Sequence, residues 1–275
     1  MSGAQPHLRN VLLGLIARQW LQPLWRGLHR LALGGLGFLN GDPRWNGEER
    51  FLADLAARWR REDRRPLVID AGANEGSFAA AVLRLAPEAR IVCLEPNPPT
   101  FERLAARFRH EPRVSLIQAA LAEIDGVVPL HDTQAEGSQH ASLLAATFRA
   151  IHPGNASATM VPARSLDSLL MERGSPRVDL LKLDIEGAEK AALDGAVWSL
   201  ARGRIAAIQL EMNAHNILSG LSLWALSERL PDFELFRILP DGLEPLVTAE
   251  RRYNARDEVF KYSNVAALRR GNTAR

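Results

Sequence analysis

The sequence predicts an α/β protein in which a mostly parallel sheet is covered by helices on both faces. Three observations lead to this fold class: short apolar runs of strand length, segments of helical periodicity between them, and glycine- or proline-containing turns at their boundaries. Strands separated by single helices pair in parallel, because each crossover returns the chain to the same end of the sheet. The chain of 275 residues has room for one large domain or two small ones.

The first 46 residues are predicted to form an N-terminal amphipathic helical extension. Apolar residues recur at helical spacing from Leu8 to Leu31, arginines are interspersed among them, and no acidic residue precedes Asp42. We expect these helices to pack over the following domain or into a dimer, because amphipathic helices usually form part of a core. The other interpretation is a peripheral contact with an anionic membrane surface through residues 8–33. Glycine- and proline-containing turns separate the extension from a single domain over residues 47–275.

A helix opens this domain, and strands and helices alternate after it. From Glu48, apolar residues recur every three to four positions until a charged run and Pro66 end the pattern. Strands are predicted over residues 67–70, 91–94, 114–118, 178–183, 205–211, 234–239 and 261–268, and helices over residues 77–85, 99–108, 165–171, 188–198 and 221–230. Residues 126–130 resemble part of a hairpin, and the polar stretch 132–160 is expected to form a loop or lid with some helix.

Charge balance and cysteine content exclude several classes of protein. Lysine and arginine number 34 and aspartate and glutamate 32, which is too balanced to indicate a nucleic-acid partner. Cys93 is the only cysteine, so no internal disulfide can form and nothing indicates an oxidising compartment. No run approaches the roughly 20 apolar residues that span a bilayer. We therefore expect a cytoplasmic protein, peripheral to a membrane if the extension binds one.

The clearest motif covers residues 68–76, which run Val-Ile-Asp-Ala-Gly-Ala-Asn-Glu-Gly. A buried strand ends at Asp70, a glycine turn follows, and the helix that begins near Ser77 presents free amide groups to a ligand. Glu95 ends the next strand, where a carboxylate can accept hydrogen bonds from both hydroxyls of a ribose. The glycine spacing differs from the dinucleotide fingerprint, and Asp70 would repel phosphates. The motif therefore favours S-adenosylmethionine, which is cationic and lacks phosphate, over a nicotinamide cofactor.

A second group of charged residues ends the fourth strand. Residues 179–189 run Asp-Leu-Leu-Lys-Leu-Asp-Ile-Glu-Gly-Ala-Glu. Ligands of open α/β sheets bind at the carboxyl ends of the strands, so Asp184 and Glu186 are expected near the reacting end of the cofactor. Lys182 lies on the same side of the strand as Asp184 and can act as its charge partner. The alternative is that these acids only cap the next helix.

Together these segments resemble the FkbM-type methyltransferases. The resemblance rests on residues 68–76, 94–98 (Leu-Glu-Pro-Asn-Pro), 165–169 (Ser-Leu-Asp-Ser-Leu) and 181–189, and it covers roughly residues 47–268. It implies a Rossmann-like sheet of seven strands with the last strand antiparallel, S-adenosylmethionine as the cofactor, a ribose held by Glu95, and Asp184 at the methyl-transfer centre. It also implies that Ala119 and Ala120 border the adenine. The expected cofactor-binding residues are Asp70, Gly72, Ala73, Asn74, Gly76, Glu95, Pro96, Asn97, Ala119, Ala120 and Asp184.

Methyl transfer to a hydroxyl also needs a group that removes the proton. The candidates are Asp184, Glu211 and His215, because they lie at or just after the ends of the fourth and fifth strands, and Lys182 completes the predicted catalytic set. We therefore predict an O-methyltransferase that acts on a hydroxyl of a small molecule or glycan, without a nucleic-acid partner. A divalent metal held by the acids is a minor hypothesis, and the expected site contains no metal.

Three other functions are weighed against this prediction. Residues 97–99 run Asn-Pro-Pro, as in amino-methylating enzymes of nucleic acids, but here the sequence follows the second strand and not the fourth, which indicates a helix start. A nicotinamide-dependent oxidoreductase is disfavoured by the glycine spacing. A non-catalytic binding protein of the same fold is disfavoured by the intact Asp70, Glu95 and Asp184.

Overall fold

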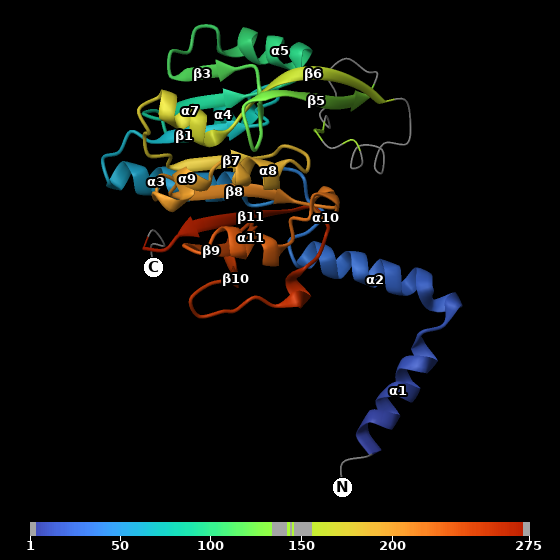
Figure 1. Ribbon diagram of the computed structural model, residues 1–275. Helices are drawn as coiled ribbons and strands as arrows, with labels where there is room; N and C mark the ends of the chain where they lie inside the picture. Colours follow the sequence, from blue (N-terminus) through green and yellow to red (C-terminus); the bar gives the residue numbers. More distant parts are fainter. Residues whose placement is uncertain (1–3, 134–141, 144, 146–155, 272–275) are drawn as a thin grey trace.

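The computed structural model describes residues 4–133, 142–143, 145 and 156–271, and an eight-stranded sheet forms its centre. The strands of this sheet are β1 (Leu67–Ala71), β2 (Arg90–Leu94), β3 (Val114–Ile117), β7 (Leu180–Leu183), β8 (Ala207–Met212), β9 (Phe233–Leu239), β10 (Gly242–Val247) and β11 (Ser263–Arg269). Their order across the sheet is β10-β9-β11-β8-β7-β1-β2-β3 (Figure 1). Neighbouring strands from β3 to β8 pair in parallel, whereas β11 runs antiparallel to both β8 and β9.

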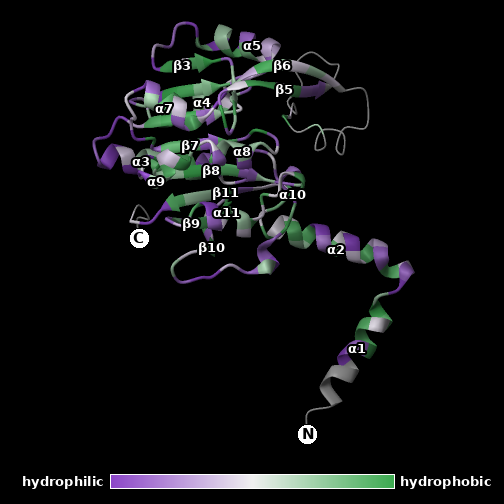
Figure 2. Cartoon of the chain, in the orientation of Figure 1, coloured by the Kyte–Doolittle hydropathy of each residue, from purple (hydrophilic) through white to green (hydrophobic). Residues whose placement is uncertain are grey.

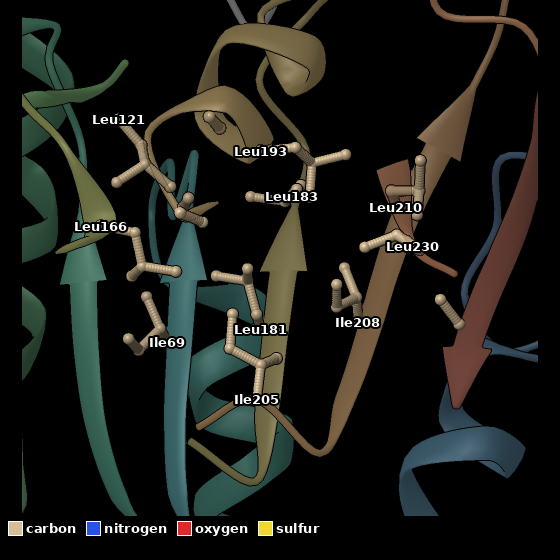
Figure 3. Close-up of a cluster of buried hydrophobic side chains, with 14 of the residues drawn as sticks. Ile69, Leu121, Leu166, Leu181, Leu183, Leu193, Ile205, Ile208, Leu210 and Leu230 are labelled. Carbon is tan, nitrogen blue, oxygen red and sulfur yellow. The ribbon is translucent and has the colours of Figure 1, made fainter. Parts of the chain in front are cut away.

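Helices cover both faces of this sheet, which confirms the predicted fold class. One face carries α3 (Glu48–Arg61), α4 (Ser77–Leu85) and α5 (Pro98–Phe108), and the other carries α7 (Leu166–Glu172), α8 (Glu189–Asp194), α9 (Val197–Ala201) and α11 (Leu223–Arg229). Alternate strand residues face the two layers, so Ile69 packs with the second set of helices and Val68 with the first. Figure 3 shows the second layer, where leucines and isoleucines of four strands meet Leu166 and Leu193. The expected seven strands are present, and β10 adds an eighth at the edge.

A second sheet of three strands corrects the expectation for residues 132–160. It consists of β4 (Ala120–Leu121), β5 (Gly126–Thr133) and β6 (Ala156–Arg164), with β6 in the middle. β6 pairs antiparallel with β5 along its whole length, from Gly126 opposite Ala163 to Thr133 opposite Ala156. Residues 156–160 were not predicted as a strand because their composition is polar. They form one because β6 pairs with β5, which lies far from it in the sequence. Residues 134–141, 144 and 146–155 of the expected lid lie outside the described residues.

Most element boundaries agree with the predicted ones, and the exceptions have local causes. The helix expected over 188–198 is divided into α8 and α9 at Gly195, where a Cβ would lie 2.2 Å from the carbonyl oxygen of Ala122. The strand β10 was not predicted, because Pro245 interrupts its ladder and its register shifts there. The short helix α10 (His215–Ser219) was also not predicted.

The N-terminal helices do not pack over the domain, which corrects one part of the expectation, whereas packing into a dimer stays a prediction. α1 (Ala4–Ile16), a short 3-10 turn (Gln19–Leu21) and α2 (Gln22–Gly35) project away from the body in Figure 1. Leu33 is the one buried residue of α2, and contact with the domain begins at the last turn of that helix. Within the described residues, no helix combines the length and the apolar character needed to cross a membrane.

Candidate functional site

A cavity opens at the carboxyl ends of β1, β2 and β7, with the small sheet as its opposite wall. About 570 Å³ of space free of protein atoms lies within it, including the open solvent at its mouth. The lining residues are Gly72, Asn74, Glu95, Pro96, Thr100, Ala119, Ala120, Leu121, Leu130, Leu143, Asp184, Ile185 and Glu186. Ligands of open α/β sheets bind at this edge, so the cavity is the candidate functional site.

The loop after β1 is held against β2 and β7 by its own backbone. The amides of Gly72 and Ala73 both donate to the carbonyl oxygen of Leu94, at 3.0 Å. Gly72 has a φ of +77°, and a Cβ at this position would lie 1.9 Å from the carbonyl oxygen of Asp184. Glycine is required here, because both the conformation and the close approach exclude a side chain. The loop then ends at Gly76, which caps the start of α4.

Glu95 is the anchored carboxylate of the cavity. Its Oε1 accepts a hydrogen bond from the amide of Asn97 and its Oε2 one from the amide of Asn74, both at 2.9 Å. Burial raises the pKa of Glu95 to about 7, although these amides act in the opposite direction. Each oxygen has a further lone pair for a ligand. The carboxylate is therefore fixed in place and able to accept hydrogen bonds from a ligand in the cavity.

Lys182 lies between two carboxylates, one of which, Asp184, lines the cavity. Its Nζ lies 2.8 Å from Oδ2 of Asp184 and 3.9 Å from Oδ1 of the fully buried Asp70. Burial acts to lower the pKa of Lys182, but the carboxylates of Asp184, Asp70 and Glu48 outweigh this effect and raise the pKa. Burial also raises the pKa of Asp70 to about 6. Lys182 therefore remains an ammonium group that holds Asp184, and it does not act as a proton acceptor.

Glu189 fixes the turn that follows β7. Its Oε1 accepts hydrogen bonds from the amides of Ile185, at 3.3 Å, and Gly187, at 3.2 Å. Its Oε2 accepts one from Nδ2 of Asn216, at 3.2 Å. Burial raises the pKa of Glu189 to about 7. Because Ile185 and Glu186 of this turn line the cavity, Glu189 positions the cavity wall from behind.

His215 lies beside Glu186 at the start of α10. Its Nδ1 is 2.8 Å from Oε2 of Glu186, and both side chains are largely buried. Glu186 lines the cavity, so this pair extends from the cavity wall into the protein. The sequence predicted His215 as a candidate base and Glu186 near the reacting end of the cofactor, but not the pairing of the two. The pairing depends on how α10 packs against the turn after β7, which no local pattern shows.

Glu211, at the end of β8, holds its proton more strongly than an ordinary carboxyl group. Burial, followed by the negative charges of Asp184 and Glu186, raises the pKa of Glu211 well above its usual value. Nδ2 of Asn213 donates a hydrogen bond to Oε1 of Glu211. A protonated carboxyl group can donate a hydrogen bond but cannot accept the proton of a hydroxyl. In the part of the chain that the structure describes, no three histidine, cysteine or carboxylate side chains are grouped to hold a metal ion.

The small sheet supplies an apolar wall that sequence analysis largely missed. It and the adjoining residues contribute Leu121, Leu130 and Leu143, in addition to the expected Ala119 and Ala120. Oγ of Ser142 donates a hydrogen bond to the carbonyl oxygen of Glu186, at 2.8 Å. Ser142 also forms a backbone bridge with His131 on β5. This segment therefore links the small sheet to the turn after β7 across the cavity.

Most of the expected cofactor residues line the cavity, namely Gly72, Asn74, Glu95, Pro96, Ala119, Ala120 and Asp184. Asp70, Ala73, Gly76 and Asn97 are not among its lining residues. Nδ2 of Asn97 donates to Asp132 on β5, so Asn97 joins α5 to the small sheet. Of the expected catalytic residues, Asp184 lines the described cavity, and Lys182, Glu211 and His215 are not among its lining residues. Thr100 and the leucines were not indicated by any motif, and Ile185 lies in the motif of residues 179–189 but was not predicted as a site residue.

Buried carboxyl groups are expected to make the protein without cofactor less stable as the pH rises from 5 to 8. Folding raises the pKa to about 7 for Glu95 and Glu189 and to about 6 for Asp70. The unfolded chain therefore loses these protons first, so the contribution of these groups to stability falls between the unfolded and the folded pKa values and is constant above them. The raised pKa of Glu211 acts in the same direction. Urea unfolding at pH 5, 6, 7 and 8 measures this change. In Glu189→Gln the slope should be smaller, and a wild-type stability that rises over this range would contradict the expectation.

Comparisons with known proteins agree with this geometry. The chain matches the FkbM methyltransferase domain over residues 70–223. It is 30% identical over 194 residues to NoeI, a 2-O-methyltransferase of Sinorhizobium fredii, with 65% of this chain and 76% of that protein covered. The methyltransferase sdnD of Sordaria araneosa is 28% identical over 168 residues, with 50% of this chain and 64% of that protein covered.

Among solved structures, a TehB-like S-adenosylmethionine-dependent methyltransferase from Corynebacterium glutamicum aligns with a TM-score of 0.39 at 13% identity. The alignment covers 78% of this chain and 88% of that chain. The match to the FkbM domain includes the end of β1 and the whole of β2 and β7, whose carboxyl ends border the cavity, and it extends over more than half of the chain. The chain therefore belongs to the FkbM methyltransferase family.

Proposed function

We propose that the protein binds S-adenosylmethionine in the cavity and transfers its methyl group to a hydroxyl oxygen of a small molecule or glycan. The observation that carries the proposal is Glu95, a carboxylate fixed by two backbone amides at the end of β2. Family membership and the similarity to NoeI, whose name states a 2-O-methyltransferase, support an oxygen acceptor. We assign this activity to a domain over residues 47–275, with residues 1–46 as a separate extension.

The residues of the cavity fit the proposed cofactor. Glu95 would accept hydrogen bonds from the ribose hydroxyls, and the small apolar Ala119 and Ala120 would border the adenine. The amino-acid end would lie near Gly72 and Asp184, which both line the cavity and where a carboxylate suits a cationic group. S-adenosylmethionine supplies an electrophilic methyl group on a sulfonium, so the protein contributes chiefly by orientation.

His215 is the proposed general base, with Glu186 as its partner. Lys182 holds Asp184 as an ion pair, and Glu211 retains its proton, so neither carboxyl group is suited to take the proton of a hydroxyl. A carboxylate 2.8 Å from Nδ1 of His215 would orient the imidazole. The hydroxyl proton would pass to His215 as the new carbon–oxygen bond forms.

Calorimetric titration with S-adenosylhomocysteine tests the cofactor assignment. We expect micromolar binding by the wild-type protein and no binding of NADH. Glu95→Ala should weaken the binding at least about 100-fold, because it removes two hydrogen bonds to a charged group, each contributing about 1.5–3 kcal/mol. Glu102→Ala is the matched control, since Glu102 is exposed on the neighbouring helix α5.

Circular dichroism separates a binding defect from a folding defect in Glu95→Ala. The assignment fails if a folded wild-type protein does not bind S-adenosylhomocysteine, or if Glu95→Ala binds it as tightly as the wild-type protein does. The first outcome would also favour a non-catalytic protein that keeps the methyltransferase fold. Binding of NADH would instead favour an oxidoreductase.

A further inference from the structure

The N-terminal arm, which we define as residues 4–36, exposes an unusual amount of apolar surface. Trp20 is 76% exposed and Leu31 is 75% exposed, and further apolar side chains of both helices are open to solvent. These further side chains are Val11, Leu12, Leu13, Leu15, Ile16, Leu24, Leu28 and Leu36. A contiguous apolar surface of this kind on a soluble domain marks an interaction site.

In α2 the exposed apolar residues form one stripe. Leu24, Leu28 and Leu31 are spaced by four and three positions, which places them on the same face of the helix. Arg26 and Arg30 interrupt the apolar positions, and Figure 2 shows hydrophobic and hydrophilic residues alternating along α2. A helix with leucines on one face and arginines on another is suited to lie in the plane of a membrane surface.

Charge indicates the nature of the partner. Arg9, Arg18, Arg26 and Arg30 are all exposed, and no aspartate or glutamate occurs before Asp42. Two arms packed against each other would bring these positive charges together without a carboxylate to neutralise them. An anionic lipid surface offers both a complementary charge and an apolar phase for the leucines and Trp20.

The arm is anchored at both of its joints. At the bend between the helices, Nε1 of Trp25 donates to the carbonyl oxygen of Ile16, at 2.8 Å. At the root, the amide of Leu39 donates to the carbonyl oxygen of Tyr262, at 2.9 Å, and the guanidinium of Arg237 lies 4.3 Å from the ring centre of the buried Phe38. The arm therefore has a fixed attachment to the domain.

This attachment lies at the same edge of the sheet as the cavity. Tyr262 immediately precedes β11, whose first residue, Ser263, pairs with Met212 at the carboxyl end of β8. Phe38, at the root of the arm, lines a small pocket together with Asn213, which lies two residues before His215. Figure 1 shows α2 projecting from the body at its root. The 14 residues of α2 extend about 21 Å at 1.5 Å per residue. A membrane-bound arm would keep the edge of the sheet at which the cavity opens within about this distance of the lipid surface.

We propose that the N-terminal arm binds the surface of membranes that contain anionic phospholipids, with its leucine stripe in the lipid and its arginines at the headgroups. This proposal does not depend on the methyl-transfer reaction, because it rests on the exposed apolar surface and the charge of the arm alone. The binding is interfacial and reversible, so added salt should weaken it.

Cosedimentation of the full chain with lipid vesicles tests the proposal. We expect binding to vesicles of equal parts phosphatidylcholine and phosphatidylglycerol, and much weaker binding to phosphatidylcholine alone. Arg18→Gln/Arg26→Gln/Arg30→Gln should lower the partition coefficient roughly 100-fold, at about fivefold per arginine. Leu24→Ser/Leu28→Ser/Leu31→Ser should lower it by at least about as much. The control, Ile124→Ser/Val197→Ser, removes exposed apolar residues from the body and should bind as the wild-type protein does.

Sedimentation velocity without vesicles tests the alternative that a second copy of the chain covers the leucine stripe. A stable dimer that the triple leucine variant dissociates would overturn the proposal and assign the stripe to self-association. Absence of binding to anionic vesicles, or binding that survives the leucine substitutions, would overturn it as well. All the arm variants should bind S-adenosylhomocysteine as the wild-type protein does. If the wild-type protein itself does not bind it, the cofactor assignment fails while the proposal for the arm is unaffected.

Discussion

Replacing His215 by glutamine is expected to lower kcat for methyl transfer by about 100- to 10,000-fold, while S-adenosylhomocysteine binds as in the wild-type protein. General bases contribute rate factors of this size. His215 lies behind the cavity wall and is paired with Glu186, so its loss should not disturb the Glu95 end of the cavity. A large fall in kcat with unchanged cofactor affinity is the result that a base, and not a structural histidine, would give.

Single-turnover transfer from labelled S-adenosylmethionine measures this effect, once a panel of hydroxylated small molecules and glycans has provided an acceptor. His110→Gln is the matched control, because His110 is exposed at the end of α5. Glu186→Gln should lower kcat by a smaller factor, since the imidazole keeps its basic nitrogen but loses the partner that orients it. If His215→Gln keeps wild-type kcat in a folded protein, the proton is taken by another group, and Asp184→Asn becomes the next variant to measure.

Local signals in the sequence were sufficient to predict β1, β2 and the helix α4, which surround the Glu95 end of the cavity. The helix expected over residues 77–85 has these same bounds in the structure, because Gly76 starts it and an apolar face defines its length. The strands β1 and β2 also agree closely with the prediction, since buried parallel strands have continuous apolar runs. Glu95 could be predicted because its position at the end of β2 follows from chain order alone.

The rest of the site depends on contacts between distant segments. β6 is recognisable only with β5 as its partner, and together with β4 these strands form the apolar wall at Leu121 and Leu130. The pair of His215 and Glu186 joins two turns that follow different strands. The exposed arm illustrates the same limit, because helical periodicity defines an apolar face but does not show what covers it.

Gly72→Ala is expected to abolish binding of S-adenosylhomocysteine and to lower the free energy of unfolding by about 2–5 kcal/mol. A positive φ costs an ordinary residue about 1–2 kcal/mol, and an overpacked side chain adds about 1–3 kcal/mol. At this position the added Cβ would lie 1.9 Å from the carbonyl oxygen of Asp184 and 2.9 Å from its carbonyl carbon. Both are backbone atoms, so no change of rotamer can relieve the contact.

The strain must therefore be relieved by moving the ends of β1 and β7 apart. These strands pair from Val68 opposite Leu180 to Ala71 opposite Leu183, and the loop that would move carries the amide of Asn74 to Glu95. Both walls of the proposed cofactor site would then shift together, which is why a single methyl group is expected to abolish binding.

Gly174→Ala is a matched control for the backbone conformation. Gly174 has a φ of +74°, and a Cβ there would meet no atom within 4 Å, so this variant carries the cost of the conformation without the clash. Urea unfolding of the two variants thus isolates the contact between Gly72 and Asp184, and calorimetry reports its effect on ligand binding. If Gly72→Ala is no less stable than Gly174→Ala and still binds S-adenosylhomocysteine, the close approach of β1 and β7 does not shape the cofactor site.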